Sequence, residues 1–593
     1  MRLSDYVVSR LAETGVRDVF FVPGYGNTHL VDALARDENI NGVSVHHEQS
    51  AAMAAVAYAK YNCDFGACFV TTGCGGTNAV TGLLHAYQDS VPCLFVSGQS
   101  DTKHIIDCFD VRLRQVGKQE ADIISIVRSI TKYAVTVKDA REIALHFDRA
   151  LFYAKTGRPG PVWLDIPLDV QSAPVDAESL ERFHPEPPEA DVVSIRESAR
   201  ELALDIKRAQ RPIILAGNGV RSSHSVLEFQ KFARDFGLPV ATTKMAVDIL
   251  DTEGGLFTGV VGSQSGSRAG NFAVANSDLL IVLGCRLSVN VTGADYGNFA
   301  REARVVAVDI DGEEHSKNTV RIDRLIQADL KTFLGEINTL VPPEAKRDWI
   351  EKCAHWKKIF PFLTEEERNA DAIDLYLFNE KMSMAAKDNA VFVSDAGNVC
   401  FTTPASVVIS GGKRSITSGA QAEMGFSLPG AIGACYASGM GEVGCVTGDG
   451  SVMMNIQELA TISFRKLPIK IFVINNGGYA SIRAMQKEAY RGRTLGTDGT
   501  NGLGLPSFER IAAGFDLKYV RINDAGELDE KLGAVFSFDG PVLCEVMCAR
   551  VQKNFLVAMG RSPEGRMGMR PLEDLSPFLD REIFLKEMII KPV

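Results

Sequence analysis

Short apolar runs recur along the chain, and most of them end abruptly in glycine, asparagine, aspartate or serine. Longer segments with the 3.6-residue period of a helix separate these runs. Strand-like runs alternating with helices predict an α/β protein made of consecutive domains with parallel sheets. The clearest expected strands are Val19–Val22, Val43–His46, Phe69–Thr72, Leu94–Ser97, Pro212–Ala216, Leu279–Leu283, Val305–Val308, Ala390–Val393, Val443–Val446, Ile469–Ile474, Leu517–Val520 and Val542–Val546.

Two stretches of different composition divide this pattern. Pro174–Ala190 is rich in proline and acidic residues and is typical of a linker. Glu344–Asp371 is charged and helical, and we expect it to connect two domains. A chain of 593 residues is long enough for several domains. We therefore expect three α/β domains and a C-terminal tail, at residues 1–174, 191–343, 372–560 and 561–593.

The most informative stretch is Gly444–Ser481. An apolar run ends there in Gly448-Asp449-Gly450-Ser451, a helical segment follows over Val452–Phe464, and a second apolar run ends in Asn475-Asn476-Gly477-Gly478. Strand, helix and strand in this order predict a βαβ unit. Both polar clusters would then lie at the carboxyl ends of neighbouring strands, where open α/β sheets bind ligands.

The residue types in these two clusters point to a metal ion and a phosphate. Asp449 and Asn476 offer hard oxygen ligands, which suit Mg²⁺ that is shared with phosphates. Gly450 allows close approach of the backbone, and the helix N-terminus after it favours an anion. Two ordinary turns would have similar residues. The presence of both clusters in one βαβ unit, however, favours a Mg²⁺–diphosphate site.

This pairing, with Asn476 lying 27 residues after Asp449, resembles the thiamine-diphosphate motif GDG…NN. The resemblance implies that Asp449, Asn476 and the backbone carbonyl of Gly478 bind the metal. It also places Gly450 and Ser451 at the cofactor. Tyr479 and Ala480 begin a helix that we expect to close over the diphosphate.

Glu48 stands before a helix of small residues in VHHEQSAAMAAVAYAK, which TTGCGGTNAVTGLLHAYQDSVPCLFVSGQ follows. An acid near a helix N-terminus is common for electrostatic reasons alone. The two segments, however, resemble the pyrimidine-binding domain of acetolactate synthases. The resemblance implies that Glu48 is catalytic, because the equivalent Glu bonds to the aminopyrimidine ring and promotes its imino tautomer. Gly26 and Asn78, from the glycine-rich turns of this domain, are expected cofactor contacts.

The chain departs from this family at three places in its first third. The family usually has PGG, SGPGATN and FQE where this chain has Pro23-Gly24-Tyr25-Gly26, Thr72–Asn78 and Lys118-Gln119-Glu120. Gln119 is retained, and the resemblance places it on the substrate side as a catalytic residue. Lys118 replaces an aromatic ring by a cation. It is either a solvated loop lysine or part of an altered site for a polar or anionic acceptor.

The remaining segments extend the resemblance over nearly the whole chain. VLGCRLSVNVTG and VAVDIDGEEHSKN resemble GxRFDDRVTG and VDIDxxEIxKN of the central domain, which carries FAD in many members. Arg286 is retained, but Ser288 and Asn290 replace an acid and a second arginine. FAD binding is therefore left open.

The last third carries two further matches. TSGAQAEMGFSLP resembles SGGLGAMGFGLP, which implies that Met424 is the apolar wedge under the bent cofactor. The loop with Gly397 and Asn398 is implied to contact the diphosphate. The tail segment PLEDLSPFLDREIF resembles tails of acetolactate-synthase-like proteins from bacterial surface-sugar pathways.

Composition excludes several other classes. The net charge is −11 and no basic block occurs, which argues against nucleic-acid binding. The 12 cysteines include no CxxC pair, so a zinc site is not expected, and reduced cysteines fit a cytoplasmic protein. No apolar run approaches the ~18 residues of a membrane span, and the N-terminus is not a signal peptide.

The sequence therefore predicts a thiamine-diphosphate- and Mg²⁺-dependent enzyme of the acetolactate synthase type. It would decarboxylate a 2-oxo acid, with pyruvate the expected donor. The acyl unit would pass to a second 2-oxo acid or to a nucleotide-linked keto-sugar. The alternatives are an oxidase, a 2-hydroxyacyl lyase or decarboxylase, or a non-catalytic cofactor-binding subunit. Because the family places its cofactor between two subunits, we expect a homodimer or homotetramer.

Overall fold

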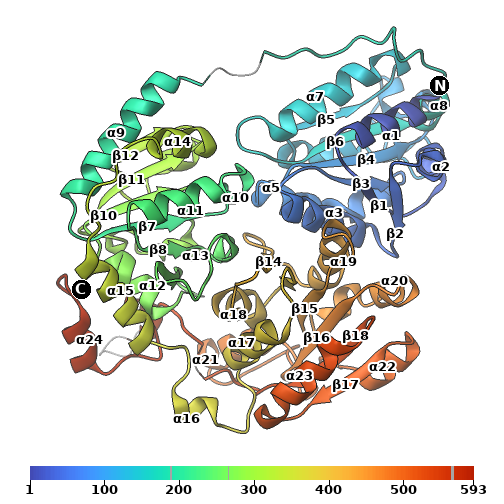
Figure 1. The fold of residues 1–593 in the computed structure, drawn as a ribbon. Helices are drawn as coiled ribbons and strands as arrows, with labels where there is room; N and C mark the ends of the chain where they lie inside the picture. Colours follow the sequence, from blue (N-terminus) through green and yellow to red (C-terminus); the bar gives the residue numbers. More distant parts are fainter. Residues whose placement is uncertain (187–189, 265, 554, 562–566) are drawn as a thin grey trace.

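The structure, a computed structural model, describes residues 1–186, 190–264, 266–553, 555–561 and 567–593. Within these residues the chain forms three domains, each built on a six-stranded parallel sheet with helices on both faces (Figure 1). The expected fold class is confirmed. The boundaries between the domains stay predictions.

The N-terminal sheet has the strand order β2-β1-β3-β4-β6-β5. Its strands β3 and β4 are buried along their whole length, as expected for a parallel sheet that helices cover on both sides. The strands are β1 (Asp18–Phe21), β2 (Asn41–Ser44), β3 (Gly66–Val70), β4 (Cys93–Gln99), β5 (Tyr133–Thr136) and β6 (Val162–Pro167). The main helices are α1 (Leu3–Glu13), α2 (Thr28–Arg36), α3 (Glu48–Asn62), α5 (Val80–Gln88) and α7 (Ile143–Lys155).

The central sheet has the order β12-β11-β10-β7-β8-β9. Its strands are β7 (Pro212–Ala216), β8 (Val240–Thr242), β9 (Phe257–Val260), β10 (Leu279–Leu283), β11 (Arg304–Asp309) and β12 (Arg324–Gln327). The longer helices that cover it are α9 (Val192–Arg208), α11 (Val226–Asp235), α12 (Arg268–Ala275), α14 (Leu330–Ile337) and α15 (Arg347–Ile359).

The C-terminal sheet has the order β14-β13-β15-β16-β18-β17. Its strands are β13 (Val391–Ser394), β14 (Arg414–Thr417), β15 (Val443–Gly448), β16 (Ile469–Asn475), β17 (Lys518–Ile522) and β18 (Val542–Met547). The helices are α17 (Leu375–Ala385), α18 (Asn398–Ser406), α19 (Ser427–Ala437), α20 (Glu458–Phe464), α21 (Ala480–Ala489), α22 (Phe508–Gly514) and α23 (Leu528–Ser537).

The expected βαβ unit is present, with one correction. Strands β15 and β16 pair in parallel, and Gly448 lies opposite Ile474 at their carboxyl ends. The single helix expected over Val452–Phe464 is instead a 3₁₀ turn, Val452–Asn455, followed by α20. The side chain of Asn455 explains the break, because it bonds to Gln49 and to the carbonyl of Gly425 rather than facing one side of a continuous helix.

The N-terminal and C-terminal domains meet where α3 packs on α19 (Figure 1). Nearly every side chain of the first twelve residues of α3 is buried, and most are small. The backbones approach so closely that an added Cβ at Gly433 would lie 2.0 Å from the carbonyl oxygen of Ala54. Overpacking of this kind costs about 1–3 kcal/mol, so Gly433 permits the contact.

The C-terminal tail returns to the central domain. Helix α24 (Arg581–Glu587) lies near α15 in Figure 1, and Glu587 accepts hydrogen bonds from Lys352 and Trp356 of α15 at 2.6 and 3.0 Å. Asn271 and Arg268 of α12 donate to the carbonyls of Leu572 and Leu575. The tail is thus part of the central domain's packing.

Two further features bear on the class of protein. None of the helices in the described parts of the chain combines the length and the apolar character needed to cross a membrane. All 12 cysteines are free thiols, and most are buried.

Candidate active site

The two polar clusters of the βαβ unit meet at the ends of β15 and β16. The amide of Asp449 donates to the carbonyl of Ile474 at 3.0 Å. The carboxylate Oδ2 of Asp449 accepts from the amide of Gly478 at 2.8 Å. Asp449 is 1% exposed. Three residues expected at the metal, Asp449, Asn476 and Gly478, therefore lie on two adjoining turns.

The side chains of Asn475 and Asn476 differ in their bonding. Asn475 donates to Glu545 at 2.6 Å and accepts from the amide of Gly477 at 3.2 Å. The Oδ1 atom of Asn476 is buried and has no hydrogen-bond partner among the described residues. A buried oxygen without a partner is unfavourable. A cation bound there would satisfy it, so the site fits a metal ion.

The electrostatics of Asp449 agree with this fit. Burial raises the pKa of this carboxyl, and backbone amides of the two turns, led by that of Gly478, act in the opposite direction. Burial therefore prevails, and no ion pair with Asp449 is found among the described residues. A divalent cation would supply an opposite charge, which at short range favours the ionised form.

Two glycines allow neighbouring groups to pack closely on the turns of the site. A Cβ at Gly450 would lie 2.2 Å from the ring of Tyr479, which covers this turn. Gly478 has φ +117°, and a Cβ there would lie 2.1 Å from the carbonyl oxygen of Thr497. Side chains are excluded at both positions. Helix α21 begins next to them, at Ala480, as expected.

Asp395 binds the turn that follows β15. Its Oδ2 accepts from Ser451 at 2.6 Å and from Ser427 at 2.8 Å. Burial raises the pKa of Asp395 to about 6. Ser451, which the sequence assigned to the cofactor, thus uses its hydroxyl hydrogen within the protein, and its oxygen also accepts from the amide of Gly425 at 3.0 Å.

The loop after β13 reaches the same place. Gly397 has φ +67° and precedes α18, whose first residue is Asn398. A Cβ at Gly397 would lie 3.7 Å from the hydroxyl of Ser481 in α21. Gly397, one of the two residues expected at the diphosphate, therefore adjoins the helix expected to cover it.

Arg483 is a residue that the sequence did not single out. It is 4% exposed, and its guanidinium donates to the carbonyls of Gly477 and Asn476 at 2.8 and 3.0 Å. It therefore holds the turn that carries Asn476 and Gly478, two of the expected metal ligands. Its position one turn into α21 was the only available signal, and that signal does not distinguish it from a surface arginine.

Glu48 is the first residue of α3 and is 9% exposed. Its Oε2 accepts from Asn78 Nδ2 at 2.9 Å. Asn78, expected at the cofactor, thus orients the carboxylate of Glu48 in this structure. The next residues, Gln49 and Ser50, bond to Asn455 just beyond the GDGS turn, so the start of α3 lies beside the C-terminal domain.

The other expected residues of the N-terminal domain lie on its glycine-rich turns. Gly26 is buried, and its amide donates to Thr71 at 3.0 Å. Gln119 is exposed with φ +59°. A Cβ at Gly73 would lie 1.9 Å from the carbonyl oxygen of Gln119, so only glycine leaves room for that carbonyl. Lys118 places its ammonium 4.9 Å from the ring centre of Tyr25, so two departures from the family pattern are in contact.

A cavity of about 270 Å³ opens at the carboxyl ends of the central strands. Glycine turns after β7 and β10 line it, together with Arg286 and Asp309, which follow or end β10 and β11. The loop after β14 also borders it, through Gly419 and Ala420. This is where an open parallel sheet binds a nucleotide-like ligand.

A three-domain α/β chain with a buried carboxylate and an unpartnered amide oxygen at the strand ends of its third sheet, among the described residues, is typical of a class of cofactor-dependent enzyme. Family models for the thiamine pyrophosphate enzymes match here in order. The N-terminal TPP binding domain matches residues 1–126, the central domain residues 199–337, and the C-terminal TPP binding domain residues 395–546.

Curated relatives agree over nearly the whole length. The chain is 31% identical to the acetolactate synthase isozyme 2 large subunit of Escherichia coli K12, over 97% of this chain and 100% of that protein. It is 33% identical to a probable acetolactate synthase large subunit of Methanocaldococcus jannaschii, over 92% of each. The chain belongs to the thiamine pyrophosphate enzyme family and is an acetolactate-synthase-like enzyme of that family.

Substitution of the two adjacent asparagines separates structural from ligand-binding roles. We expect Asn475→Ala to lower the melting temperature of the metal-free protein, because Glu545 loses the hydrogen bond to its Oε1 and keeps only the one from Tyr519, a cost of about 1–3 kcal/mol. Asn476→Ala removes a buried oxygen without a partner among the described residues, so it should leave that temperature unchanged or raise it. Thermal melting with and without Mg²⁺ and thiamine diphosphate measures both effects.

Ligand binding to the folded state raises the melting temperature. The wild type should gain this stabilisation, and Asn476→Ala should lose most of it. An Asn476→Ala protein that gains as much as the wild type would exclude this side chain as a ligand.

Proposed function

We propose that this enzyme, with thiamine diphosphate and Mg²⁺, decarboxylates pyruvate and transfers the acyl unit to an acceptor carbonyl. The supporting observation is that the turns after β15 and β16 bring the buried Asp449 together with Asn476, whose buried Oδ1 has no hydrogen-bond partner among the described residues. The relatives named acetolactate synthase support the donor and the reaction type.

The residues of the site divide the work of binding. Asp449, Asn476 and the carbonyl of Gly478 would hold Mg²⁺. The amides of the Gly450 turn and the start of α21 would bind the diphosphate, since helix N-termini favour anions. The bound cofactor supplies a carbon nucleophile and an electron sink for the loss of CO₂.

Glu48 would handle the proton. Because Asn78 donates to Oε2, the other oxygen of the Glu48 carboxyl would be the one to hold a proton toward the bound cofactor. The buried position at the start of α3 keeps this carboxyl away from bulk water. A positioned acid–base group of this kind typically contributes about 10²–10⁴-fold in rate.

Glu48→Gln tests this role. The amide oxygen can still accept from Asn78, but the side chain no longer takes up a proton. We expect CO₂ release from pyruvate to fall about 100-fold or more, with little change in cofactor affinity. The measurement is CO₂ and product formation by purified protein, with cofactor binding followed by titration.

The same assay separates the alternatives. Near-normal turnover in Glu48→Gln would remove the assignment. A wild type that binds cofactor but performs no chemistry would indicate a non-catalytic subunit. Hydrogen peroxide formation would indicate an oxidase, and aldehyde release from a 2-hydroxyacyl thioester would indicate a lyase.

The contact of Tyr25 with Lys118 supports an altered acceptor site. Both side chains are exposed and stand on the glycine-rich face next to Gln119. An aromatic ring holding an ammonium fixes a positive charge at this face. We propose that the acceptor is anionic, either a second 2-oxo acid or a nucleotide-linked keto-sugar.

Replacing Lys118 by Phe should weaken acceptor binding without affecting the donor step. We expect KM for the acceptor to rise about tenfold, the effect of ~1.4 kcal/mol, while CO₂ release from pyruvate alone is unchanged. Lys103→Phe, at another exposed lysine of the same domain, is the control. Unchanged acceptor preference in Lys118→Phe would identify Lys118 as a solvated loop residue.

Flavin, subunit number and location complete the proposal. The central cavity with Arg286 is the proposed FAD site, and flavin absorbance of freshly purified protein tests it.

A homodimer or homotetramer is proposed because Glu48 and Asp449 belong to different domains. An active monomer in sedimentation would refute it. The free thiols support a cytoplasmic location, which fractionation of cells would test.

A further inference from the structure

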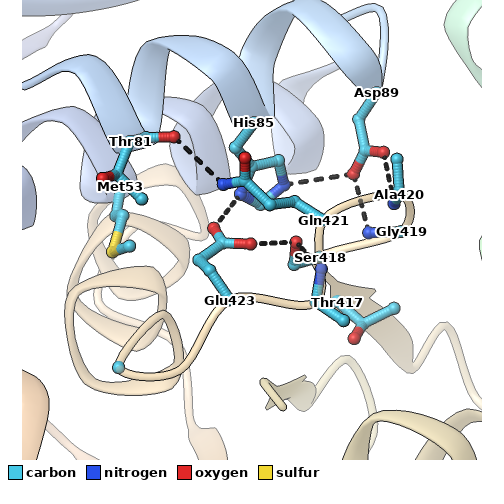
Figure 2. Close-up of polar contacts among 12 residues, drawn as sticks. Met53, Thr81, His85, Asp89, Thr417, Ser418, Gly419, Ala420, Gln421 and Glu423 are labelled. Atoms are coloured by element: carbon cyan, nitrogen blue, oxygen red, sulfur yellow. Dashed lines mark hydrogen bonds and ion pairs between the residues drawn. The ribbon is translucent and has the colours of Figure 1, made fainter.

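A loop between two domains carries Met424, the residue expected under the cofactor. Residues 418–426 connect β14 to α19 in the C-terminal domain. Figure 2 shows this loop lying against α5 of the N-terminal domain, which presents Thr81 and His85 to it, and against Asp89, the residue directly after α5. Met424 is partly buried and directly follows Glu423, which points at His85.

His85 and Glu423 form the central contact. The imidazole Nδ1 lies 2.6 Å from Glu423 Oε1. The side chain of His85 is fully buried and that of Glu423 is 8% exposed. The other oxygen of Glu423 accepts a hydrogen bond from the Ser418 hydroxyl, and the amide of Ala422 donates to the same hydroxyl at 2.9 Å. Glu423 therefore closes the loop on itself as well as onto α5.

Asp89 and Lys60 hold the start of the loop. The carboxylate of Asp89 accepts from the amides of Gly419 and Ala420 at 2.8 and 2.9 Å. Lys60, at the end of α3, donates to Asp89 at 2.6 Å and to the carbonyl of Thr417 at 2.7 Å. These side chains are also almost completely buried.

The far end of the loop is bound to the cofactor site. The amide of Gly425 donates to Ser451, which in turn donates to Asp395. Asn455 donates to the carbonyl of Gly425 at 2.9 Å. The loop that carries Met424 is thus bound to side chains of the N-terminal domain on one side and to the GDGS turn and Asn455 on the other.

Burial and the neighbouring charges act in opposite directions on these groups. Burial opposes ionisation of Asp89 and Glu423, but Lys60 and His85 outweigh it, so the pKa values of both carboxyls are lowered. Burial and the positive charge of Lys60 oppose the charged form of His85. The carboxylates of Glu423 and Asp89 outweigh both, so the pKa of His85 is raised. The imidazole Nε2 lies 2.7 Å from Lys60 and 3.1 Å from Asp89, between a donor and an acceptor.

We propose that His85 and Glu423 are positioning residues: their buried contact across the domain interface fixes the loop that presents Met424. The link from Met424 to the cofactor rests on the proposed function, whereas the anchoring of the loop does not. Buried ion pairs often add little stability over apolar residues. Here the buried contacts matter for geometry, because side chains from three separate segments bind one short loop.

The test compares Glu423→Ala with Glu423→Gln, which keeps an oxygen for His85 and a group of the same shape. Amide hydrogen exchange of residues 418–425 is measured in cofactor-free protein, together with cofactor affinity in the presence of Mg²⁺ and turnover with pyruvate. In Glu423→Ala we expect loop exchange and the Kd for thiamine diphosphate each to rise about tenfold or more, since a hydrogen bond to a charged group is lost. The kcat should fall with little change in KM.

Glu423→Gln should restore most of each effect. Glu380→Ala is the matched control, because it removes a carboxylate from the Arg368 ion pair of the same domain, away from the loop. It should leave loop exchange, cofactor affinity and kcat unchanged. If Glu423→Ala does not fold, Ser418→Ala removes the hydroxyl that binds Glu423 and carries the same test.

Three outcomes would overturn the proposal. They are unchanged loop exchange in the alanine variant, raised exchange with unchanged cofactor affinity and kcat, and a loss of kcat that Glu423→Gln does not restore. A wild type that releases no CO₂ from pyruvate would instead refute the proposed donor. Loop exchange and cofactor affinity, which need no donor, would still decide the positioning role.

Discussion

The close contact between α3 and α19 determines where the parts of the site lie. Because Gly433 of α19 has no side chain, its backbone lies close against the backbone of Ala54 in α3. This contact fixes both ends of α3 against the C-terminal domain. At one end Glu48 is followed by residues that bind Asn455, and at the other Lys60 binds the carbonyl of Thr417. A bulkier residue at Gly433 would displace both ends together.

Much of the fold could be predicted from the sequence, because parallel strands buried on both faces leave continuous apolar runs. The place of the two polar turns could also be predicted, because β15 and β16 follow one another along the chain and pair in parallel, which puts Asp449 and Asn476 at neighbouring strand ends. The break after Asn455 could not, since it depends on bonds to Gln49, about 400 residues earlier in the chain.

The roles of individual polar residues were harder to predict, because they depend on which partner each finds in space. Asn78 binds Glu48, and Ser451 binds Asp395, although the motif assigned both to the cofactor. His85 and Glu423 lie 338 positions apart, and neither stands in a pattern that predicts the other. A single sequence contains no periodicity that pairs such residues, whereas a helix or strand repeats its signal every few positions.

All three domains meet at the loop that carries Met424. The N-terminal domain binds it through Asp89 and His85, and the C-terminal domain through Ser451. The central domain reaches it as well, because a Cβ at Gly419 would lie 2.5 Å from the sulfur of Met245, and the central cavity is bordered by Gly419 and Ala420. A ligand in that cavity would therefore contact the same loop from the third side. Such a ligand could stabilise the position of Met424 by packing alone, without any chemical step of its own, because a loop held from several sides has fewer conformations left to lose.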